Sequence, residues 1–260
     1  MKYAIIGLGF IYPRHKQAIE KTGGEIILTC DNDLNKPADF SNWREMYESP
    51  KFQEVDAVVI CTPNYLHREM AAEALKLGKR VLCEKPLTIN GIEGLDGVNV
   101  VLQLRYAPQI LLLKNRVIKD VKVIARMFRD ETYFKSWKGD AEKSGGLLFN
   151  LGVHYLDLLL FLLGNDYETG EFTMPGKNYS YGTLKYKDKT GHFEIEIVDD
   201  KTKQERYIEI DGEKIILSDK DNLSYEDLHT EVYKHFIAGD GIPLSEAKKS
   251  INLIEKIYGK

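Results

Sequence analysis

Short apolar segments alternate with polar or mixed stretches through the first third of the chain. Four of them have the length of a strand: residues 3–7 (YAIIG), 26–30 (IILTC), 57–61 (AVVIC) and 80–83 (RVLC). The stretches between them are long enough for helices, and residues 14–22 predict one. This alternation is typical of a parallel sheet made of strand-helix-strand units.

The pattern changes after Leu104 to strands with a period of two residues. Residues 122–128, 182–188 and 192–198 predict such strands, and in the last of these phenylalanine and isoleucine alternate with glutamate. Residues 206–217 predict a hairpin around an Asp-Gly turn, and the C-terminal end predicts an amphipathic helix. The second half therefore predicts a mostly antiparallel sheet with one buried and one solvated face.

Length, composition and charge narrow the class of ligand. A chain of 260 residues that is 43% hydrophobic favours two domains and therefore a cleft. A net charge of −4 argues against nucleic acid or a membrane surface as the main partner, so we expect a small molecule. No long apolar run or signal layout is recognisable, which predicts a cytoplasmic protein. The three cysteines fit neither a disulfide framework nor a zinc site.

The residues that directly follow the predicted parallel strands should face a ligand, because open parallel sheets bind ligands at their carboxyl ends. After the first strand come Gly7 and Gly9, which would let the backbone approach a pyrophosphate at a helix N-terminus. Asp31 follows the second strand, where a carboxylate can accept hydrogen bonds from a ribose and would repel a 2′-phosphate. This favours NAD over NADP, with Asp33 as the competing carboxylate and Arg14 as a residue that could accommodate a phosphate.

Residues 147–163 predict a helix that ends before Gly164. Asn150, His154 and Asp157 are spaced so that they share one face of this helix. A lone histidine without cysteine or glutamate at ligand spacing gives poor support for zinc, so no metal is expected.

Four motifs in order resemble the glucose-fructose oxidoreductase/inositol dehydrogenase (Gfo/Idh/MocA) family. They are GLGFIYPRH, CTPNYLH, CEKP and SGGLLFNLGVHYLD. Within that family PRH, LQLRY, KSWKGD, NLGVH and DLHT resemble the UDP-N-acetyl-2-amino-2-deoxy-D-glucuronate 3-dehydrogenases of surface-polysaccharide pathways. The resemblance implies an α/β plus α+β fold: a Rossmann dinucleotide-binding domain in residues 1–104, then an open-sheet domain for substrate binding and oligomerisation in residues 105–260. One departure is the glycine-rich segment 91–97, where the family usually has a full helix; another subunit could cover the apolar surface this leaves.

The resemblance also implies the chemistry, which is NAD-dependent oxidation of the C3 hydroxyl of a UDP-linked N-acetylglucosaminuronic acid. It implies a cis Lys85-Pro86 bond, with Lys85 between nicotinamide and sugar. Both Lys85 and His154 are expected to touch the reacting oxygen, His154 being favoured as acid/base and Lys85 polarising the oxygen. Asn150 stands where many relatives have an aspartate, so it can orient the histidine ring without supplying charge.

Further residues are expected to line the site. Cofactor contacts are expected from the glycine turn, the loops after the third and fourth strands and the following strand, at Gly7, Gly9, Phe10, Ile11, Asp31, Thr62, Pro63, Asn64, His67, Glu84, Lys85 and Gln103. His67 could instead cap the next helix, and Glu84 could be a salt-bridged supporting residue. Substrate contacts are expected at Lys85, Arg105, Trp137, Lys138, Asn150 and His154; for Trp137 and Lys138, a plain surface loop is the alternative.

Two other functions stay open at this point. One is a dehydrogenase of another sugar or of inositol, with NAD or NADP, and the other is a module that binds dinucleotide without catalysis. A homo-oligomer, dimer or tetramer, is expected through the open sheet.

Overall fold

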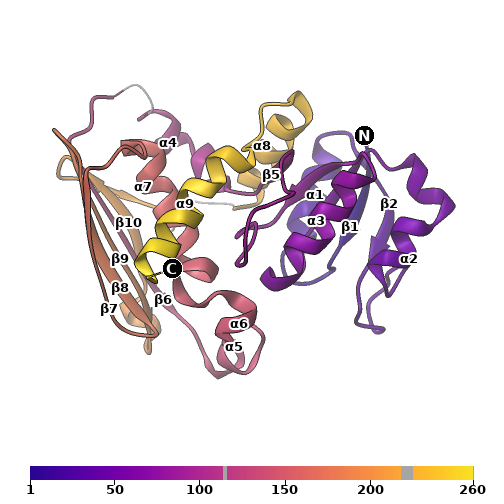
Figure 1. Cartoon of the computed structure of the whole chain (residues 1–260), viewed down its shortest axis with the longest axis horizontal. Coiled ribbons are helices and arrows are strands. Elements are labelled where there is room, and N and C mark those ends of the chain that lie inside the picture. Colours follow the sequence, from indigo (N-terminus) through magenta and orange to yellow (C-terminus); the bar gives the residue numbers. More distant parts are fainter. Residues whose placement is uncertain (114–115, 218–224, 260) are drawn as a thin grey trace. The chain divides into compact units, whose positions relative to one another are not determined.

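The computed structural model describes residues 1–113, 116–217 and 225–259. The chain forms two compact units (Figure 1). The first comprises Met1–Gln103 and Ser224–Ala247, and the second comprises Leu104–Leu223 and Lys248–Lys260. The division expected at residue 104 leaves out the return of the chain to the first unit, which the sequence pattern does not reveal.

The first unit contains a five-stranded sheet in the order β2-β1-β3-β4-β5, with every neighbouring pair parallel. Its strands are β1 (Lys2–Ile6), β2 (Glu25–Cys30), β3 (Ala57–Ile60), β4 (Arg80–Cys83) and β5 (Val98–Val100). Its helices are α1 (Tyr12–Lys21), α2 (Trp43–Glu48), α3 (His67–Lys76) and α8 (Tyr225–Ala238), with 3₁₀ turns at Pro50–Glu54 and Asn64–Leu66. The central strands β1 and β3 are buried nearly throughout, which explains their continuous apolar sequences.

The connection from β4 to β5 contains no helix in the structure, in agreement with its glycine-rich sequence. The outer edge of β5 pairs with the segment that follows α8. Val100 N donates a hydrogen bond to Ile242 O at 2.8 Å, and Asn99 forms an isolated β-bridge with Pro243. Helix α8 packs on α1 and also contacts β4, where the Arg80 guanidinium lies 4.3 Å from the centre of the Phe236 ring. The segment returning from the C-terminal part of the chain therefore completes the first unit.

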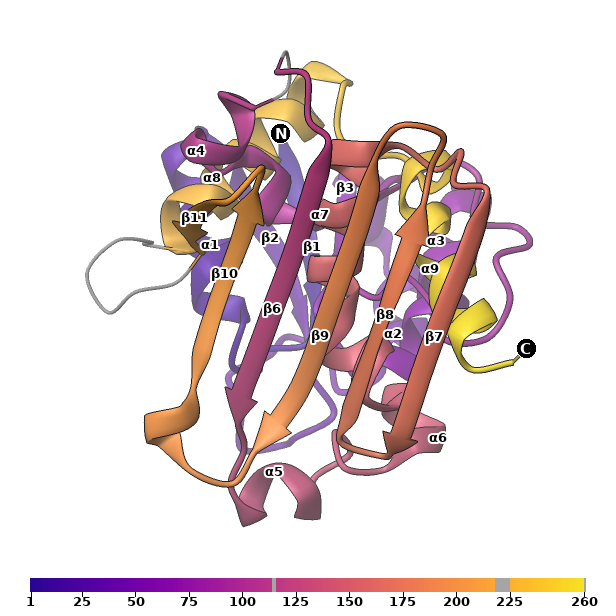
Figure 2. The ribbon, with the colours of Figure 1, turned by 90° about the vertical axis from the view of Figure 1, so that its left-hand side faces the viewer.

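The second unit contains a six-stranded sheet in the order β11-β10-β6-β9-β8-β7 (Figure 2). The strands are β6 (Asp120–Phe128), β7 (Thr169–Gly176), β8 (Tyr179–Lys185), β9 (Thr190–Val198), β10 (Glu205–Ile210) and β11 (Glu213–Ile216). All neighbours are antiparallel except β6 and β9. The turn between β10 and β11 has positive φ at Asp211 and Gly212, as the predicted Asp-Gly hairpin requires.

Helix α7 (Val153–Leu163) covers one face of this sheet and contacts β6 and β9. A π-helical turn, Leu148–Gly152, precedes it, so the predicted helix is not a regular α-helix at its start. The other helical elements are α4 (Pro108–Leu111), α5 (Glu131–Lys135), α6 (Ala141–Ser144), α9 (Leu244–Ile257) and 3₁₀ turns at Gln103–Tyr106 and Lys201–Lys203. Together, the parallel sheet and the mixed, mostly antiparallel sheet confirm the expected fold class.

Residues 141–163 are long and apolar enough to cross a membrane by length and composition. However, 72% of the most apolar window is buried within the chain, and the helix covers a sheet. Its hydrophobicity is therefore accounted for as that of a core helix.

Candidate active site

The turn after β1 has the geometry of a dinucleotide loop. Gly7 has a φ of +95°, and a Cβ placed on it would lie 2.7 Å from Cys61 O, so a side chain is excluded. A Cβ on Gly9 would meet nothing within 4 Å. The protein itself thus gives no packing reason for a glycine at position 9, whereas close approach of a ligand would.

Asp31 follows β2 and fixes this loop. Its Oδ2 accepts a hydrogen bond from Leu8 N at 2.6 Å, and its Oδ1 accepts one from Asp33 N at 2.9 Å. A carboxylate has about four acceptor positions, so Asp31 keeps capacity for ribose hydroxyls. Nearby, Phe10 is 82% exposed and the Arg14 guanidinium lies 5.6 Å from its ring, while Ile11 precedes the first residue of α1. The loop therefore fits a pyrophosphate, and Asp31 fits a ribose.

The loops after β3 and β4 are joined by His67. Its Nδ1 lies 2.7 Å from Pro86 O and its Nε2 lies 2.8 Å from Thr62 O. A neutral ring donates to one of these carbonyls and a protonated ring to both; burial lowers the pKa of His67, while the two carbonyls favour the protonated form. His67 is fully buried and makes no helix cap, and Pro63 and the buried Asn64 lie in the loop that it holds.

Lys85 follows β4, and its peptide bond to Pro86 is cis, as expected. The preceding Glu84 is 9% exposed and accepts a hydrogen bond from Lys85 N on Oε2 at 3.2 Å. Its Oε1 lies 3.0 Å from His15 Nε2 and 3.7 Å from His229 Nε2. Burial raises the pKa of Glu84, but hydrogen bonds and charge interactions with the two histidines outweigh it and hold that pKa well below its ordinary value.

In the described ranges, one group of three side chains could hold a metal ion. It consists of His15, Glu84 and His229, whose ligand atoms all lie within 4.8 Å of one another. Nothing in the sequence indicates this group, because its three members come from widely separated motifs. At the end of the same unit, Gln103 is 6% exposed, and its Oε1 has no hydrogen-bond partner among the described residues. An orphaned buried acceptor of this kind fits a ligand that donates a hydrogen bond.

In the second unit the π-helical turn and α7 carry the expected polar residues. Asn150 is buried, and its Nδ2 donates to Tyr133 Oη at 2.7 Å. His154 lies in the first turn of α7 and is half-buried. Leu148 N donates to Tyr258 Oη at 2.9 Å, which fixes the start of the π-helical turn. Such turns occur often at functional sites.

Arg105 and Asp157 form a buried bidentate ion pair. Arg105 Nε and Nη2 donate to the two carboxylate oxygens at 2.8 and 2.6 Å. The two side chains are 7% and 2% exposed, and the guanidinium also lies 4.9 Å from the Phe161 ring. Arg105 therefore stabilises the position of α7 through its ion pair with Asp157.

Trp137 and Lys138 are both half-buried, with Lys138 Nζ 5.9 Å from the centre of the Trp137 ring. Burial and the positive charge of Arg129 lower the pKa of Lys138. Burial likewise lowers the pKa of Arg129, whose guanidinium lies 5.3 Å from the Tyr133 ring. Neither cation pairs with a carboxylate in the parts of the chain that are described. Arg129 and Tyr133 were missed from the sequence, where nothing in their spacing relates them to Lys138 or Asn150.

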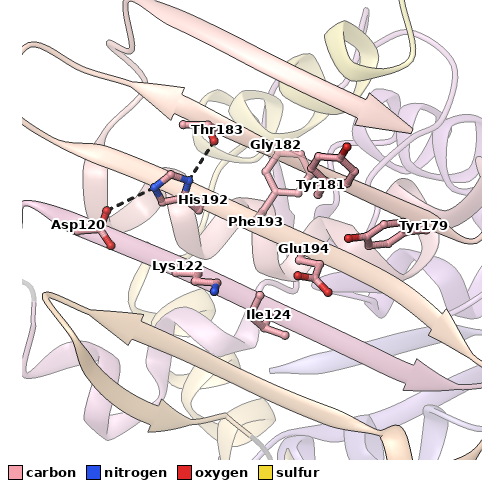
Figure 3. Close-up of a pocket in the computed structure, with 10 residues that line it drawn as sticks. All are labelled: Asp120, Lys122, Ile124, Tyr179, Tyr181, Gly182, Thr183, His192, Phe193 and Glu194. Atoms are coloured by element: carbon pink, nitrogen blue, oxygen red, sulfur yellow. Dashed lines mark hydrogen bonds and ion pairs between the residues drawn. The ribbon is translucent and has the colours of Figure 1, made fainter. Parts of the chain in front are cut away.

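A separate pocket of about 410 Å³ lies on the second unit's sheet, over β6, β8 and β9 (Figure 3). In it Thr183 Oγ1 lies 3.0 Å from His192 Nδ1, and His192 Nε2 lies 3.5 Å from Asp120 Oδ2. The His192 and Asp120 side chains are 40% and 46% exposed, so this ion pair is weak. The predicted catalytic residues lie elsewhere: Lys85 in the first unit, and Asn150 and His154 in the second.

A parallel sheet with a glycine turn and an acidic residue after its second strand, followed by a mostly antiparallel sheet, is typical of a two-part dinucleotide-binding protein. Comparison with known families agrees, because residues 1–100 match "Oxidoreductase family, NAD-binding Rossmann fold" and residues 111–258 match "Oxidoreductase family, C-terminal alpha/beta domain". The chain belongs to this glucose-fructose oxidoreductase/inositol dehydrogenase (Gfo/Idh/MocA) family, and NAD is its cofactor.

Three similar proteins add detail. The WlbA (WbpB) dehydrogenase of Thermus thermophilus, solved in complex with NAD and UDP-GlcNAcA, is 32% identical with a TM-score of 0.84, covering 98% of this chain and 93% of that chain. An uncharacterized oxidoreductase of Streptococcus pneumoniae is 29% identical over 70% of this chain and 54% of its own length. The 2,7-anhydro-N-acetylneuraminate hydratase of Mediterraneibacter gnavus is 30% identical over 69% of this chain and 53% of its own length. The chain thus spans about half the length of these curated relatives.

Proposed function

We propose that this chain oxidises the C3 hydroxyl of a UDP-linked N-acetylglucosaminuronic acid to the 3-keto sugar, with NAD as oxidant. The observation that carries the anionic class of substrate is the Arg129–Lys138 pair. Two half-buried cations, one of which lowers the pKa of the other, are unfavourable unless an anion neutralises them. A uronate carboxylate or a diphosphate supplies that anion. The complex of the 32% identical Thermus thermophilus dehydrogenase with UDP-GlcNAcA supports the same sugar.

The chemistry is divided between the two expected residues. NAD, when bound, supplies the hydride acceptor for C3. His154 takes the hydroxyl proton on a ring nitrogen, since a neutral imidazole has one nitrogen that can accept a proton. Lys85 donates a hydrogen bond to the same oxygen and polarises it. Asn150, held by Tyr133, orients the histidine without adding charge.

We assign the cofactor to the carboxyl ends of the parallel strands. Gly7 and Gly9 let the backbone approach the pyrophosphate, and Asp31 accepts hydrogen bonds from the ribose. The remaining expected contacts stay part of the proposal: Phe10, Ile11, Thr62, Pro63, Asn64, Glu84 and Gln103. His67 acts through the loops it joins, because both ring nitrogens are occupied by backbone carbonyls.

The proposed substrate contacts are Lys85, His154, Asn150, Trp137 and Lys138, and we add Arg129 because its charge lowers the pKa of Lys138. Trp137 offers an apolar wall beside the Lys138 ammonium. We assign Arg105 to the support of α7, through Asp157, rather than to direct contact with the sugar.

A dehydrogenase of an uncharged sugar or of inositol is the alternative, and a module that binds dinucleotide without turnover is the non-enzymatic one. The Arg129–Lys138 pair favours the anionic substrate, since an uncharged polyol leaves both cations without a counter-charge. The retention of both Lys85 and His154 favours turnover. The proposal also includes a cytoplasmic reaction in surface-polysaccharide biosynthesis and a homo-oligomer formed through the open sheet.

The test is the nicotinamide absorbance of the purified protein mixed with UDP-N-acetylglucosaminuronate, with and without added NAD and 2-oxoglutarate. We expect reduction of the cofactor that the keto acid reverses. UDP-N-acetylglucosamine, which lacks the carboxylate, is the matched control and should give a much weaker response. A response to inositol or free sugars alone would support the first alternative, and NAD binding without any turnover would support the second.

A further inference from the structure

A cluster of hydrogen-bond donors lies where β6 leads into α5 in the second unit. It consists of Arg129, which follows β6, Tyr133 in α5, and Lys138 in the loop beyond α5. All three side chains are half-buried, and the Arg129 guanidinium lies 5.3 Å from the centre of the Tyr133 ring. Tyr133 connects this cluster to the proposed reaction, because it also contacts Asn150.

The Tyr133 oxygen accepts hydrogen bonds, which leaves the hydroxyl proton for a further partner. Asn150 Nδ2 donates to Oη at 2.7 Å. The Arg129 side chain also hydrogen-bonds to Tyr133, and a guanidinium can only donate. Burial raises the pKa of Tyr133 although both partners oppose the change, so the phenol keeps its proton at neutral pH. No acceptor for this proton lies among the residues that the structure describes.

Lys138 also has donors to spare. Its ammonium carries three, and within the described ranges Nζ makes no hydrogen bond and no ion pair. Arg206 adds positive charge, since it lowers the pKa of Arg129 after the larger effect of burial. The nearest carboxylate in the sequence, Asp130, serves as the N-cap of α5 and accepts from Tyr133 N at 3.0 Å. A donor cluster of this charge fits a group with several anionic oxygens, which is a carboxylate or a phosphate.

We propose that Tyr133 is a specificity-determining residue, which donates its hydroxyl proton to the anionic group of the substrate while its oxygen holds Asn150. The inference rests on the proposed function and deepens it, because one side chain then joins anion recognition to the acid/base. A hydroxyl that donates to an anion becomes a better acceptor, since hydrogen bonds in a chain polarise one another. The amide proposed to orient His154 is then held more firmly. A substrate without the anion gains neither effect, so it is disfavoured in kcat as well as in KM.

The first test measures anion binding without turnover. The chain has two tryptophans, so Trp43→Phe leaves Trp137 as the only one, and its ring lies 5.9 Å from Lys138 Nζ. In this background the protein with bound NAD is titrated with D-glucuronate, with uridine diphosphate and with glucose as the neutral control, and Trp137 fluorescence is followed. We expect Tyr133→Phe to weaken binding of one anion about tenfold or more, because a hydrogen bond to a charged group is lost. A loss for glucuronate assigns the donor cluster to the carboxylate, and a loss for uridine diphosphate assigns it to the diphosphate.

Two further variants separate anion recognition from packing. Lys138→Gln acts on the same anion, so the double variant Tyr133→Phe/Lys138→Gln should lose less affinity than the product of the two single losses. Tyr181→Phe is the matched control, since Tyr181 lies on β8 at 42% exposure and should bind both anions as the wild type does. Melting temperatures show that each variant is folded.

The second test is steady-state kinetics with UDP-N-acetylglucosaminuronate. Lys138→Gln should raise KM and leave kcat nearly unchanged, because Lys138 contacts the anion alone. Tyr133→Phe should raise KM and also lower kcat about tenfold, which is part of the about 10²–10⁴-fold that a positioned acid/base contributes. This difference between the two variants is the signature of a residue that serves both the anion and Asn150.

Two results would overturn the proposal. The first is that neither anion changes Trp137 fluorescence in the wild type, or that both bind Tyr133→Phe as tightly as the wild type, which would leave Tyr133 as a support of Asn150 alone. The second is a rise in KM with kcat unchanged in Tyr133→Phe, which would separate anion recognition from the acid/base. If the sugar assignment is wrong, turnover of the nucleotide sugar fails in the wild type while the anion titrations still decide the role of Tyr133, so the two failures are distinguishable.

Discussion

The Arg105–Asp157 pair gives the sharpest test of how the second unit is held together. Asp157→Leu would leave the guanidinium buried at 7% exposure without its bidentate partner, and Arg105→Met would leave the carboxylate buried at 2% exposure. Removing one partner of a buried pair costs about 3–5 kcal/mol, because an uncompensated charge stays in the interior. That is a large part of the about 5–15 kcal/mol by which a domain is stable.

The double variant Arg105→Met/Asp157→Leu should recover most of this loss, since well-packed apolar residues often replace a buried pair at little cost. Urea unfolding followed by circular dichroism at low temperature gives the four free energies of the cycle. We expect a coupling energy above about 2 kcal/mol. Because Arg105 supports α7 in our assignment, the double variant should also keep its KM for the nucleotide sugar.

Two results would refute this reasoning. If each single change costs less than about 1 kcal/mol, the pair is not buried in solution as the structure shows. If the double variant is stable but its KM rises tenfold or more, Arg105 contacts the substrate directly, as first expected from the sequence. Lys135→Gln serves as the surface control, since Lys135 pairs with Glu131 at 76% exposure.

Other predictions follow from the cofactor loop, the cation pair and the buried carboxylate. Gly7→Ala should lower the melting temperature and abolish NAD binding, whereas Gly9→Ala should keep the melting temperature and still weaken NAD binding in calorimetry; equal effects would contradict the roles assigned to the two glycines. Lys138→Gln should raise KM for the uronate sugar about tenfold or more and leave NAD affinity unchanged, which steady-state kinetics would show. The folded-state pKa of Glu84 is depressed, so its contribution to stability is present above its unfolded pKa and is lost as the pH falls below it. The folded-state pKa of His15 is also depressed, so the protein loses stability as the pH drops through the pKa of an unfolded histidine. Melting temperatures below pH 4.5, the ordinary glutamate pKa, should therefore fall less steeply in Glu84→Gln than in wild type, and parallel curves there would contradict the linkage.

The parallel sheet was predictable because its central strands are buried on both faces. Such strands have continuous apolar sequences, and the residues that follow them, Gly7, Asp31 and Lys85, mark the ligand edge without any knowledge of the helices. The antiparallel strands were predictable for a different reason. One buried and one solvated face gives β9 its alternation of apolar residues with glutamate.

The π-helical turn was not predictable, because an apolar stretch such as residues 147–163 fits a helix of either kind. The Arg129–Lys138 pair escaped for a related reason. Arg129 follows β6 and Lys138 lies beyond α5, so no helical or strand period relates them. Arg105 was assigned to the substrate because it was expected at the end of a strand, whereas it lies in a 3₁₀ turn and its partner is set by the packing of α7 against the sheet, which only the folded chain reveals.

The return of the chain to the first unit explains a motif that had no physical reason in the sequence. DLHT resembles the nucleotide-sugar dehydrogenases, yet its histidine lies far along the chain from the glycine loop and from Lys85. In the structure α8 packs on α1, and this places His229 and Tyr233 beside His15 and Glu84. If α8 were only a cover for the sheet, apolar residues would serve better, because each buried polar group must find a partner. The cost of burying two imidazoles, a phenol and a carboxylate together is therefore an argument that this cluster has a use beyond packing α8 on α1.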